Sequence, residues 1–474
     1  MDTQAMPIAA QTASNDGAGI VIRDPRTGEF LWSVHESEPG DVASAVKAAR
    51  NAAGGWAATP AAERGARLHA AARALEAARA ELAGLNASET GRPVNEALAG
   101  IDAGVSTLVQ YAELGPVHRG HSLHGNRSAS DYTVAEPCGV AVLLTPWNDP
   151  VAVACGLIGA ALVTGNAVIH KPSERCPRLG EALGEVLAPS FPPGVLRTVS
   201  GGAGVGKLLT EAGVDVIAHV GSSAAGARIA EAGLLSGAHV IRENGGNDAL
   251  LVDRDVDPLW AAEQAAIRAF SNSGQICTSV ERIYVHTDIA RPFCAALEAE
   301  AALRNNKGSV APLVDTRMRD EVHAHVAQAR ELGAHAVEGG SVPEGPGSFY
   351  PATVLLECHD AMKVMTEETF GPVAPVQVVA SFEEGLRRAA GGKYGLAATL
   401  LTGNIAHAQQ AIATLPVGTV KINAVFGGAP GGSAQPRGAS GQGFGYGPEL
   451  LDEFSRVKVV HLAAPAQKTE AATP

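Results

Sequence analysis

The stretch GVAVLLTPWNDPVAVACGLIGAALVTGNAVIHKPSE, residues 139–174, decides the fold. Apolar runs over Gly139–Leu144 and Ala167–His170 predict two buried strands, and the uncharged run Val151–Val163 between them predicts a buried helix. A strand, a helix and a strand in so short a segment are typical of a βαβ unit with parallel strands. The chain is therefore predicted to have an α/β fold built on a parallel sheet.

The same alternation continues on both sides of this stretch. Further strands are predicted at Val195–Val199, Val216–His219, Ala249–Val252 and Arg282–Val285. Helices are predicted at Asp41–Ala53, Ala61–Leu85, Val94–Leu114, Arg178–Ala188, Val205–Ala212, Ala224–Leu235, Leu259–Asn272, Ile289–Arg304 and Asp315–Leu332. The pattern restarts after Glu243, which indicates a second α/β unit, and Val457–Leu462 alternates like an edge strand.

Composition excludes several classes of protein. A chain of 474 residues predicts two to four domains at about 150 residues each. Hydrophobic residues make up 46% and charged residues 18%, which excludes a disordered chain. The net charge of −13, without basic clusters, argues against nucleic acid as a partner. Six cysteines without a CxxC pair predict reduced thiols and a cytoplasmic location.

No segment predicts a membrane span. The apolar run Val151–Val163 has 13 residues, whereas a spanning helix needs about 20. Met1–Asp16 lacks the basic and apolar parts of a secretory signal.

Two motifs that could hold phosphate or metal are incomplete. Gly201–Lys207 resembles a P-loop, but Leu208 stands where a magnesium-binding hydroxyl is needed, so an ATPase is not expected. His118, His121 and His124 are three residues apart, but neighbouring glycines oppose a helix and no carboxylate or cysteine joins them. We therefore expect no metal site.

Cys277 follows a Ser-Gly-Gln turn. Free backbone amides in such a turn can lower the pKa of a thiol or hold an oxyanion. A cysteine in an apolar helix is usually inert packing, so Cys277 taken alone leaves a reactive and a structural role equally open. The papain-like pattern Cys-Gly-x-Cys is absent.

Polar, glycine-rich turns follow several of the predicted strands. They are Pro146–Pro150, Lys171–Glu174, Gly221–Gly226 and Glu243–Gly246. Strand ends of a parallel sheet line one ligand crevice, and the turn at Gly221 opens a helix whose N-terminus can take a pyrophosphate. The turns therefore predict one shared site.

These motifs, in this order, resemble the aldehyde dehydrogenase superfamily over about residues 20–462. The motifs are Pro-Trp-Asn at 146–148, Lys-Pro-Ser-Glu at 171–174, Gly-Ser with a later Gly at 221, 222 and 226, Glu-x-Gly-Gly at 243–246, Gly-Gln-x-Cys at 274–277 and Glu-Glu-Thr-Phe-Gly-Pro-Val at 367–373. The 34-residue separation of Glu243 and Cys277 also suits this family.

The resemblance implies a Rossmann-type dinucleotide-binding domain, an α/β catalytic domain and a small β oligomerisation flap. The expected ranges are 1–118 with 139–242 for the first, 243–447 for the second, and 119–138 with 448–474 for the flap. A homodimer or homotetramer is implied.

The resemblance also implies the residues of the site. Cys277 would attack the aldehyde and form a thiohemiacetal and then a thioester, Asn148 and the Cys277 amide would hold the oxyanion, and Glu243 would activate water. The implied cofactor is NAD, with NADP as an alternative. Its expected binding residues are Trp147, Lys171, Ser173, Glu174, Gly221, Ser222, Gly226, Glu368 and Phe370. The expected pocket residues are Asp149, Ile276 and Thr278.

The chain departs from the family pattern at several positions. Asp149 replaces an aromatic residue, which predicts an acidic pocket wall and favours an amino- or hydroxy-aldehyde. His219, Arg242 and Asn244 replace apolar residues. Leu157 replaces a lysine usual in hydrolytic members.

Two alternative functions follow from these departures. One is a CoA-acylating semialdehyde dehydrogenase, and the other is a catalytically weakened binding or scaffold protein. Because Glu243 is present to activate water, hydrolysis is the favoured fate of the thioester. A low thiol pKa at Cys277 would separate an enzyme from a scaffold.

Overall fold

The computed structural model describes residues 19–426 and 433–465. The sequence-based expectation that Met1–Asp16 is no signal lies outside these residues, as do the first 18 and last nine residues of the expected domain ranges.

The βαβ unit predicted at residues 139–174 is confirmed. It consists of β5 (Val140–Leu144), α5 (Pro150–Val163) and β6 (Ala167–Lys171). Pro150 begins α5 at a position where a backbone N–H has no intrahelical partner. Within the described ranges, no helix has both the length and the hydropathy needed to cross a membrane.

This unit lies in a six-stranded sheet with the order β19-β9-β8-β5-β6-β7. The remaining bounds are Leu196–Thr198 for β7, Val216–Gly221 for β8, His239–Asn244 for β9 and Gly441–Gln442 for β19. All neighbours are parallel except the pair β19 and β9. The carboxyl ends of β5, β6, β8 and β9 therefore lie at one edge.

A second sheet of seven strands has the order β12-β13-β14-β11-β10-β16-β17. Its strands are β10 (Asp248–Val252), β11 (Val280–His286), β12 (His335–Glu338), β13 (Thr353–Leu356), β14 (Val373–Val379), β16 (Ala397–Leu401) and β17 (Thr419–Ile422). Only β12 runs antiparallel to its neighbour. The α/β fold with two parallel sheets is thereby confirmed.

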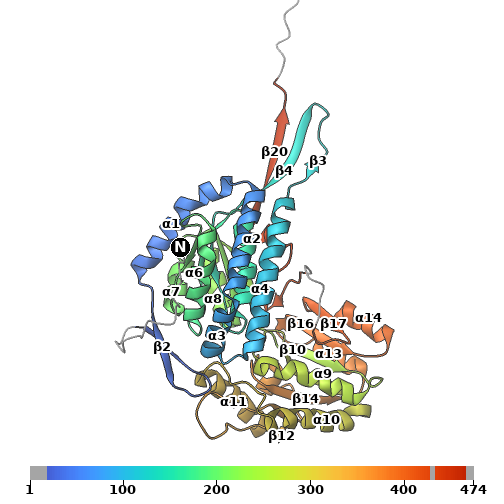
Figure 1. Ribbon diagram of the computed structural model, residues 1–474. Helices are drawn as coiled ribbons and strands as arrows, with labels where there is room; N and C mark the ends of the chain where they lie inside the picture. The colour runs from blue at the N-terminus through green and yellow to red at the C-terminus, as the bar shows by residue number, and fades with distance from the viewer. Residues whose placement is uncertain (1–18, 427–432, 466–474) are drawn as a thin grey trace, which may run out of the picture.

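Helices cover both faces of each sheet (Figure 1). The six-stranded sheet carries α1 (Pro39–Ala58), α2 (Ala61–Ala77), α3 (Arg79–Thr90), α4 (Val94–Leu114), α5, α6 (Pro177–Leu187), α7 (Ala203–Thr210) and α8 (Ser223–Ser236). The seven-stranded sheet carries α9 (Pro258–Phe270), α10 (Thr287–Asn306), α11 (Thr316–Glu331), α12 (Lys363–Thr366), α13 (Phe382–Ala389) and α14 (Ile405–Thr414). Alternate side chains of each strand, such as Val142 and Leu143, enter different core layers.

Smaller sheets complete the described chain. They are β1 (Gly19–Arg23) with β2 (Phe30–His35), β15 (Tyr394–Gly395) with β18 (Arg437–Gly438), and β20 (Ser455–Ala463) with β4 (Ala129–Pro137) and β3 (Ser122–Leu123). The last of these projects from the body of the molecule at the top of Figure 1. The edge strand predicted at Val457–Leu462 is part of β20.

Some sequence-based boundaries differ from the structure. The helix predicted at Ala61–Leu85 is two helices, α2 and α3, because the backbone leaves the helical conformation at Ala78. The surrounding sequence is rich in alanine and has no proline or glycine to mark this break. Strand β19 belongs to the first sheet although it lies in the expected catalytic range. Short helix α15 (Leu450–Glu453) and Phe454, from the expected flap range, pack in the core beneath that sheet. The expected domain ranges remain predictions.

One buried carboxylate ties the N-terminal hairpin to the first sheet. Glu89, at the end of α3, accepts hydrogen bonds from the backbone N–H groups of Arg178 at 3.1 Å and Leu179 at 2.9 Å, in the first turn of α6. It also accepts one from Trp32 Nε1 of β2 at 3.0 Å. Burial raises the pKa of Glu89 to about 7. Glu89 thus caps α6 from a distant part of the chain.

We predict that Glu89→Ala lowers the free energy of unfolding by about 3 kcal/mol, since three buried donors lose their acceptor. Glu89→Gln keeps one acceptor oxygen and is expected to be less destabilising. Urea denaturation of both variants measures the difference. An equal loss for the two variants would contradict this account.

Candidate active site

Cys277 follows a strained turn, η3 (Ser271–Gly274), at the end of α9. Asn272 and Ser273 have φ angles of 46° and 55°, a region that residues with a Cβ rarely adopt. The side chain of Gln275 braces the turn, with Nε2 donating to the Asn272 carbonyl at 3.0 Å. Cys277 therefore lies in a fixed loop before β11 and not inside a helix.

A close backbone contact sets the position of this turn. A Cβ on Gly274 would lie 2.0 Å from the carbonyl oxygen of Gly371, so only glycine fits there. Gly371 ends the segment that carries Glu368 and Phe370. Glu281, on β11 just after the cysteine, accepts hydrogen bonds from the Phe370 N–H at 2.8 Å and the Thr369 N–H at 2.9 Å. The cysteine turn and this segment are thus held against each other.

Asn148 lies beside the cysteine turn. Its Nδ2 donates to the carbonyl of Gln275 at 3.1 Å, and an amide carries a second hydrogen that remains for a ligand. Arg92, between α3 and α4, donates through Nη1 to the Asn148 carbonyl at 3.0 Å. Asn148 is therefore held from both sides.

Arg92 also changes the interpretation of Asp149. Its Nη1 lies 2.8 Å from Asp149 Oδ1, and only 14% of the Arg92 side chain is exposed. This ion pair partly offsets the negative charge of Asp149, and Arg92 also lies 3.9 Å from Glu96, so the acidic pocket wall expected from the sequence remains a prediction. The sequence could not show the pairing, because 57 residues separate the partners.

Glu243 lies near the end of β9, next to the segment that follows β19. Its Oε1 accepts a hydrogen bond from the Gly445 N–H at 3.0 Å. A Cβ on Gly445 would lie 2.0 Å from Glu243 Cγ, so a glycine is needed for the carboxyl group to occupy this position. Burial raises the pKa of Glu243 to about 8, and the Gly445 bond opposes that effect.

The pKa of the Cys277 thiol is raised, so it does not supply the low value that would separate an enzyme from a scaffold. Burial, together with the nearby Glu243 and Asp248, raises its pKa to about 12, while Arg268 acts in the opposite sense. The free amides of the turn can be recognised in the sequence, whereas the burial that raises the pKa cannot. The thiol is thus largely protonated at neutral pH.

The two glycines after Glu243 make room for Glu368. A Cβ on Gly245 would lie 1.9 Å from Glu368 Oε2, and the Gly246 N–H donates to Glu368 Oε1 at 3.1 Å. Burial raises the pKa of Glu368 well above its usual range. Glu368 thus lies against the short turn that follows Glu243.

Aromatic residues from the two halves meet at this loop. The rings of Trp147 and Phe370 are 5.7 Å apart and nearly perpendicular. Arg175 lies over the Trp147 ring at 5.2 Å and pairs with Asp315 at 2.9 Å. The expected residues Trp147, Phe370 and Glu368 thus lie together with the cysteine turn.

The other expected cofactor residues lie at strand ends of the first sheet. Lys171, which is buried, donates to the carbonyls of Pro172 at 2.7 Å and Gly201 at 2.6 Å. Ser173 follows it and is also buried, whereas Glu174 is exposed. Ser222 caps α8 through its hydroxyl, which accepts from the Ala225 N–H at 3.3 Å.

The N-terminus of α8 fits an anionic diphosphate. Gly221 lies against the His219 ring, and Gly226 would place a Cβ 2.2 Å from Asn244 Oδ1, so α8 begins close to the strand ends. Both ring nitrogens of His219 and the Ser223 hydroxyl are buried without a partner among the described residues. Free donors at a helix N-terminus are what a phosphate group requires.

Thr278 and Ile276 flank the cysteine. The Ile276 N–H donates to the Gly274 carbonyl at 2.9 Å and extends the turn. The Thr278 carbonyl accepts from Arg268 Nε at 2.8 Å. Sequence analysis did not single out Arg92, Glu281, Arg268 or Gly445. Only spatial proximity identifies them, since none belongs to a recognisable motif.

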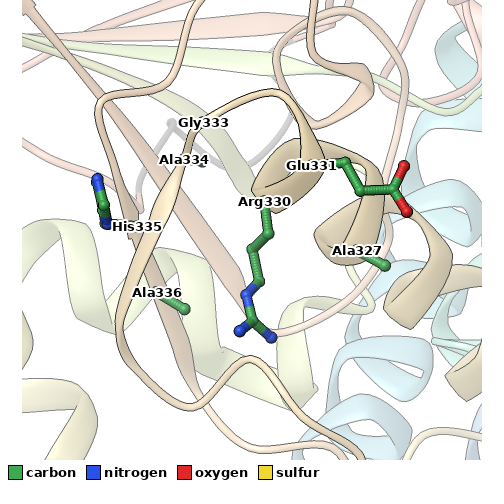
Figure 2. Close-up of a pocket in the computed structure, with 7 residues that line it drawn as sticks. All are labelled: Ala327, Arg330, Glu331, Gly333, Ala334, His335 and Ala336. Carbon is green, nitrogen blue, oxygen red and sulfur yellow. The ribbon is translucent and has the colours of Figure 1, made fainter.

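A surface hollow lies away from this cluster. It is lined by the last turn of α11 and the beginning of β12, and Figure 2 shows the Arg330 and Glu331 side chains extending in different directions. None of the expected site residues lines it. We place the active site at Cys277, because the expected residues that contact one another are grouped there.

Comparisons with known proteins identify the family of the chain. A sequence model described as the aldehyde dehydrogenase family matches residues 12–460. A betaine aldehyde dehydrogenase of Cereibacter sphaeroides (strain KD131 / KCTC 12085) is 33% identical over 463 residues, which are 94% of each chain. The solved structure of betaine aldehyde dehydrogenase from Staphylococcus aureus in complex with NAD+ has a TM-score of 0.92 at 26% identity, and covers 98% of this chain and 95% of its own. A lactaldehyde dehydrogenase structure has a TM-score of 0.91 at 28% identity, with 95% and 97% covered.

We predict that Cys277 in the protein without cofactor reacts slowly with iodoacetamide at pH 7 and that the rate rises steeply above pH 9, because burial raises its pKa. Glu243→Gln removes a neighbouring negative charge and should speed alkylation at pH 9. Peptide mass spectrometry measures the modification of Cys277. A thiol fully reactive at pH 7 would contradict the raised pKa.

Proposed function

The chain belongs to the aldehyde dehydrogenase family, and we propose that it oxidises an aldehyde to its carboxylic acid through a covalent thioester on Cys277. As a member of this family, it is an NAD(P)-dependent oxidoreductase that acts on aldehydes. The observation that carries the mechanism is the grouping of Cys277, Asn148 and Glu243 around one loop.

Cys277 is the proposed nucleophile. Its sulfur attacks the aldehyde carbon, and the oxygen becomes an oxyanion in the thiohemiacetal. The second Nδ2 hydrogen of Asn148 and the Cys277 N–H are the proposed donors to that oxygen. Because Arg92 and Gln275 hold Asn148, the donor needs no rearrangement when the charge develops.

Glu243 is the proposed base. With a pKa of about 8, its carboxylate is present in useful amounts at mildly alkaline pH and takes a proton from the water that hydrolyses the thioester. Leu157, which is fully buried in α5, cannot carry the proton onward. The exit of the proton then runs through solvent near Gly445, whose N–H holds the carboxyl group.

NAD+ is the proposed cofactor, and when bound it supplies the hydride acceptor. The α8 N-terminus with Gly221, Ser222 and Gly226 would hold the diphosphate, and Lys171 with Glu174 the adenine ribose. Trp147, Ser173, Glu368 and Phe370 complete the proposed binding residues. The exposed charge of Glu174 favours NAD+ over NADP+, because it repels a 2′-phosphate.

We also propose a homodimer or homotetramer in the cytoplasm. Val457, Val459 and Leu462 on β20 are 74%, 66% and 63% exposed, which supports burial of this strand against another subunit. Six free cysteines support a reducing compartment.

We predict that Cys277→Ala lowers turnover by at least a thousandfold while NAD+ binding persists, because the nucleophile is lost and the α8 region is untouched. Cys294→Ala, a half-buried thiol on α10, is the matched control and should retain activity. Steady-state NADH formation and quenching of tryptophan fluorescence by NAD+ measure the two properties. Retention of a tenth of wild-type turnover would exclude Cys277 as nucleophile.

We predict that Glu243→Gln gives a burst of NADH followed by turnover lowered by about a hundredfold or more, since the thioester forms but water is not activated. In the wild type, kcat should rise as the pH increases toward about 8 and level off above it, because the raised pKa keeps Glu243 protonated at lower pH. Rapid mixing over pH 6–10 tests both outcomes. Faster turnover with free CoA, and acyl-CoA as product, would favour the acylating alternative.

A further inference from the structure

Two cations border the Cys277 loop, and neither has a part in the proposed bond-making steps. Arg268, near the end of α9, donates through Nε to the Thr278 carbonyl at 2.8 Å and through Nη2 to the Thr278 hydroxyl. Its guanidinium lies over the Phe426 ring, with Cζ 4.4 Å from the centroid. Arg268 thus lies directly beside the residue that follows the nucleophile.

Lys421 on β17 faces the same layer. The register pairs it with Thr399 on β16, and Thr399 with Leu250 on β10. Side chains paired in parallel register share a face, and Asp248, two residues before Leu250, shares it as well. Helix α9, which carries Arg268, packs on this face through its alanines. Lys421, Asp248 and Arg268 therefore meet between the sheet and α9.

The Lys421 ammonium contacts the backbone next to Phe426. Its Nζ donates to the Val425 carbonyl at 3.3 Å, one residue before Phe426. Burial lowers the pKa of Lys421, the Arg268 charge lowers it further, and Asp248 and Cys277 act in the opposite sense. Both cations are thus grouped around the segments 277–278 and 425–426.

These cations are not balanced by the carboxylates near them. Among the described residues, neither Arg268 nor Lys421 forms a salt bridge. Asp248 accepts one hydrogen bond, from the Ala397 N–H at 3.0 Å, and its Oδ2 is buried without a described partner. Burial raises the pKa of Asp248, and Lys421 and Arg268 act in the opposite sense, so this one carboxylate faces two basic groups. Excess positive charge in a largely buried region is unfavourable unless a ligand brings the counter-charge.

We infer that the aldehyde oxidised at Cys277 carries an anionic group, a carboxylate or another oxyanion, which Arg268 and Lys421 hold at the pocket wall. The inference rests on the proposed role of Cys277. It differs from the cationic substrate that the name betaine aldehyde dehydrogenase indicates for a relative. The negative charge of Asp149, which would favour a cation, is partly offset by its ion pair with Arg92.

Alkylation tests this electrostatic preference without turnover. Iodoacetate is anionic and iodoacetamide is neutral. The rate of Cys277 alkylation by iodoacetate is divided by the rate with iodoacetamide at pH 9. This ratio is then normalised by the same ratio measured at Cys294. We expect a normalised ratio of about ten in the wild type. It should fall toward one in Lys421→Met and recover in Lys421→Arg. If the cations only stabilise the thiolate, they raise the rates with both reagents equally and the ratio does not depend on Lys421. A ratio unchanged by Lys421→Met therefore overturns the inference.

Turnover tests the substrate class. The probes are succinic semialdehyde with a carboxylate, glyceraldehyde 3-phosphate with a phosphate, neutral butanal and cationic 4-trimethylammoniobutanal. We expect kcat/KM to be highest for one of the two anions, which identifies the oxyanion. Lys421→Met should lower the ratio of anionic to neutral kcat/KM about tenfold, and Arg268→Gln provides a second variant.

Arg304→Leu is the matched control, because Arg304 also lies over an aromatic ring, that of Phe270, but is paired with Glu300. Its ratio should equal that of the wild type. A preference for butanal or the cationic aldehyde overturns the inference and leaves aldehyde oxidation intact. If no aldehyde yields NADH, the proposed function fails, while the alkylation ratio still decides the charge preference.

Discussion

The close approach of two glycine backbones, Gly274 and Gly371, is the constraint on which the site depends. A side chain at Gly274 would have to lie 2.0 Å from the Gly371 carbonyl, so the two turns can dock only without one. Docking brings the loop of Cys277 to the segment of Glu368 and Phe370. Glu281 maintains the contact by accepting N–H groups from that segment. A nucleophile and a cofactor segment 91 residues apart thus form one rigid unit.

Joining this unit to the first sheet depends on a second set of polar contacts. Arg92 holds the Asn148 carbonyl, and the Asn148 amide holds the Gln275 carbonyl, so a chain of hydrogen bonds runs from the α3–α4 junction to the cysteine turn. Preorganised donors of this kind are effective because they need not reorient as charge develops. Arg92 also forms an ion pair with Asp149 and offsets part of its charge. Other residues must then determine whether a charged substrate is preferred.

Burial determines the acid–base properties of the site. It raises the pKa of Cys277, Glu243 and Asp248 together, so that the thiol and the Glu243 carboxyl group are largely protonated at neutral pH. Arg268 and Lys421 are the basic groups of the same region and the source of its positive potential. A site with neutral acids and fixed cations suits an anionic ligand, and it keeps the nucleophile protonated until a base removes its proton.

The sequence by itself determined the elements and the motif residues. Val94–Leu114 has the bounds predicted from its helical period, and apolar runs predicted β5 to β8, β10 and β11, because period and burial are local properties. The other strands of the seven-stranded sheet, β12, β13, β14, β16 and β17, were not predicted. Glycine-rich turns at strand ends predicted the site, since parallel strands share one edge. The sequence did not show the break between α2 and α3, the pairing of Arg92 with Asp149, or the raised pKa of Cys277. Only the tertiary structure decided these, because ion pairing and desolvation depend on neighbours that the chain brings together from distant positions.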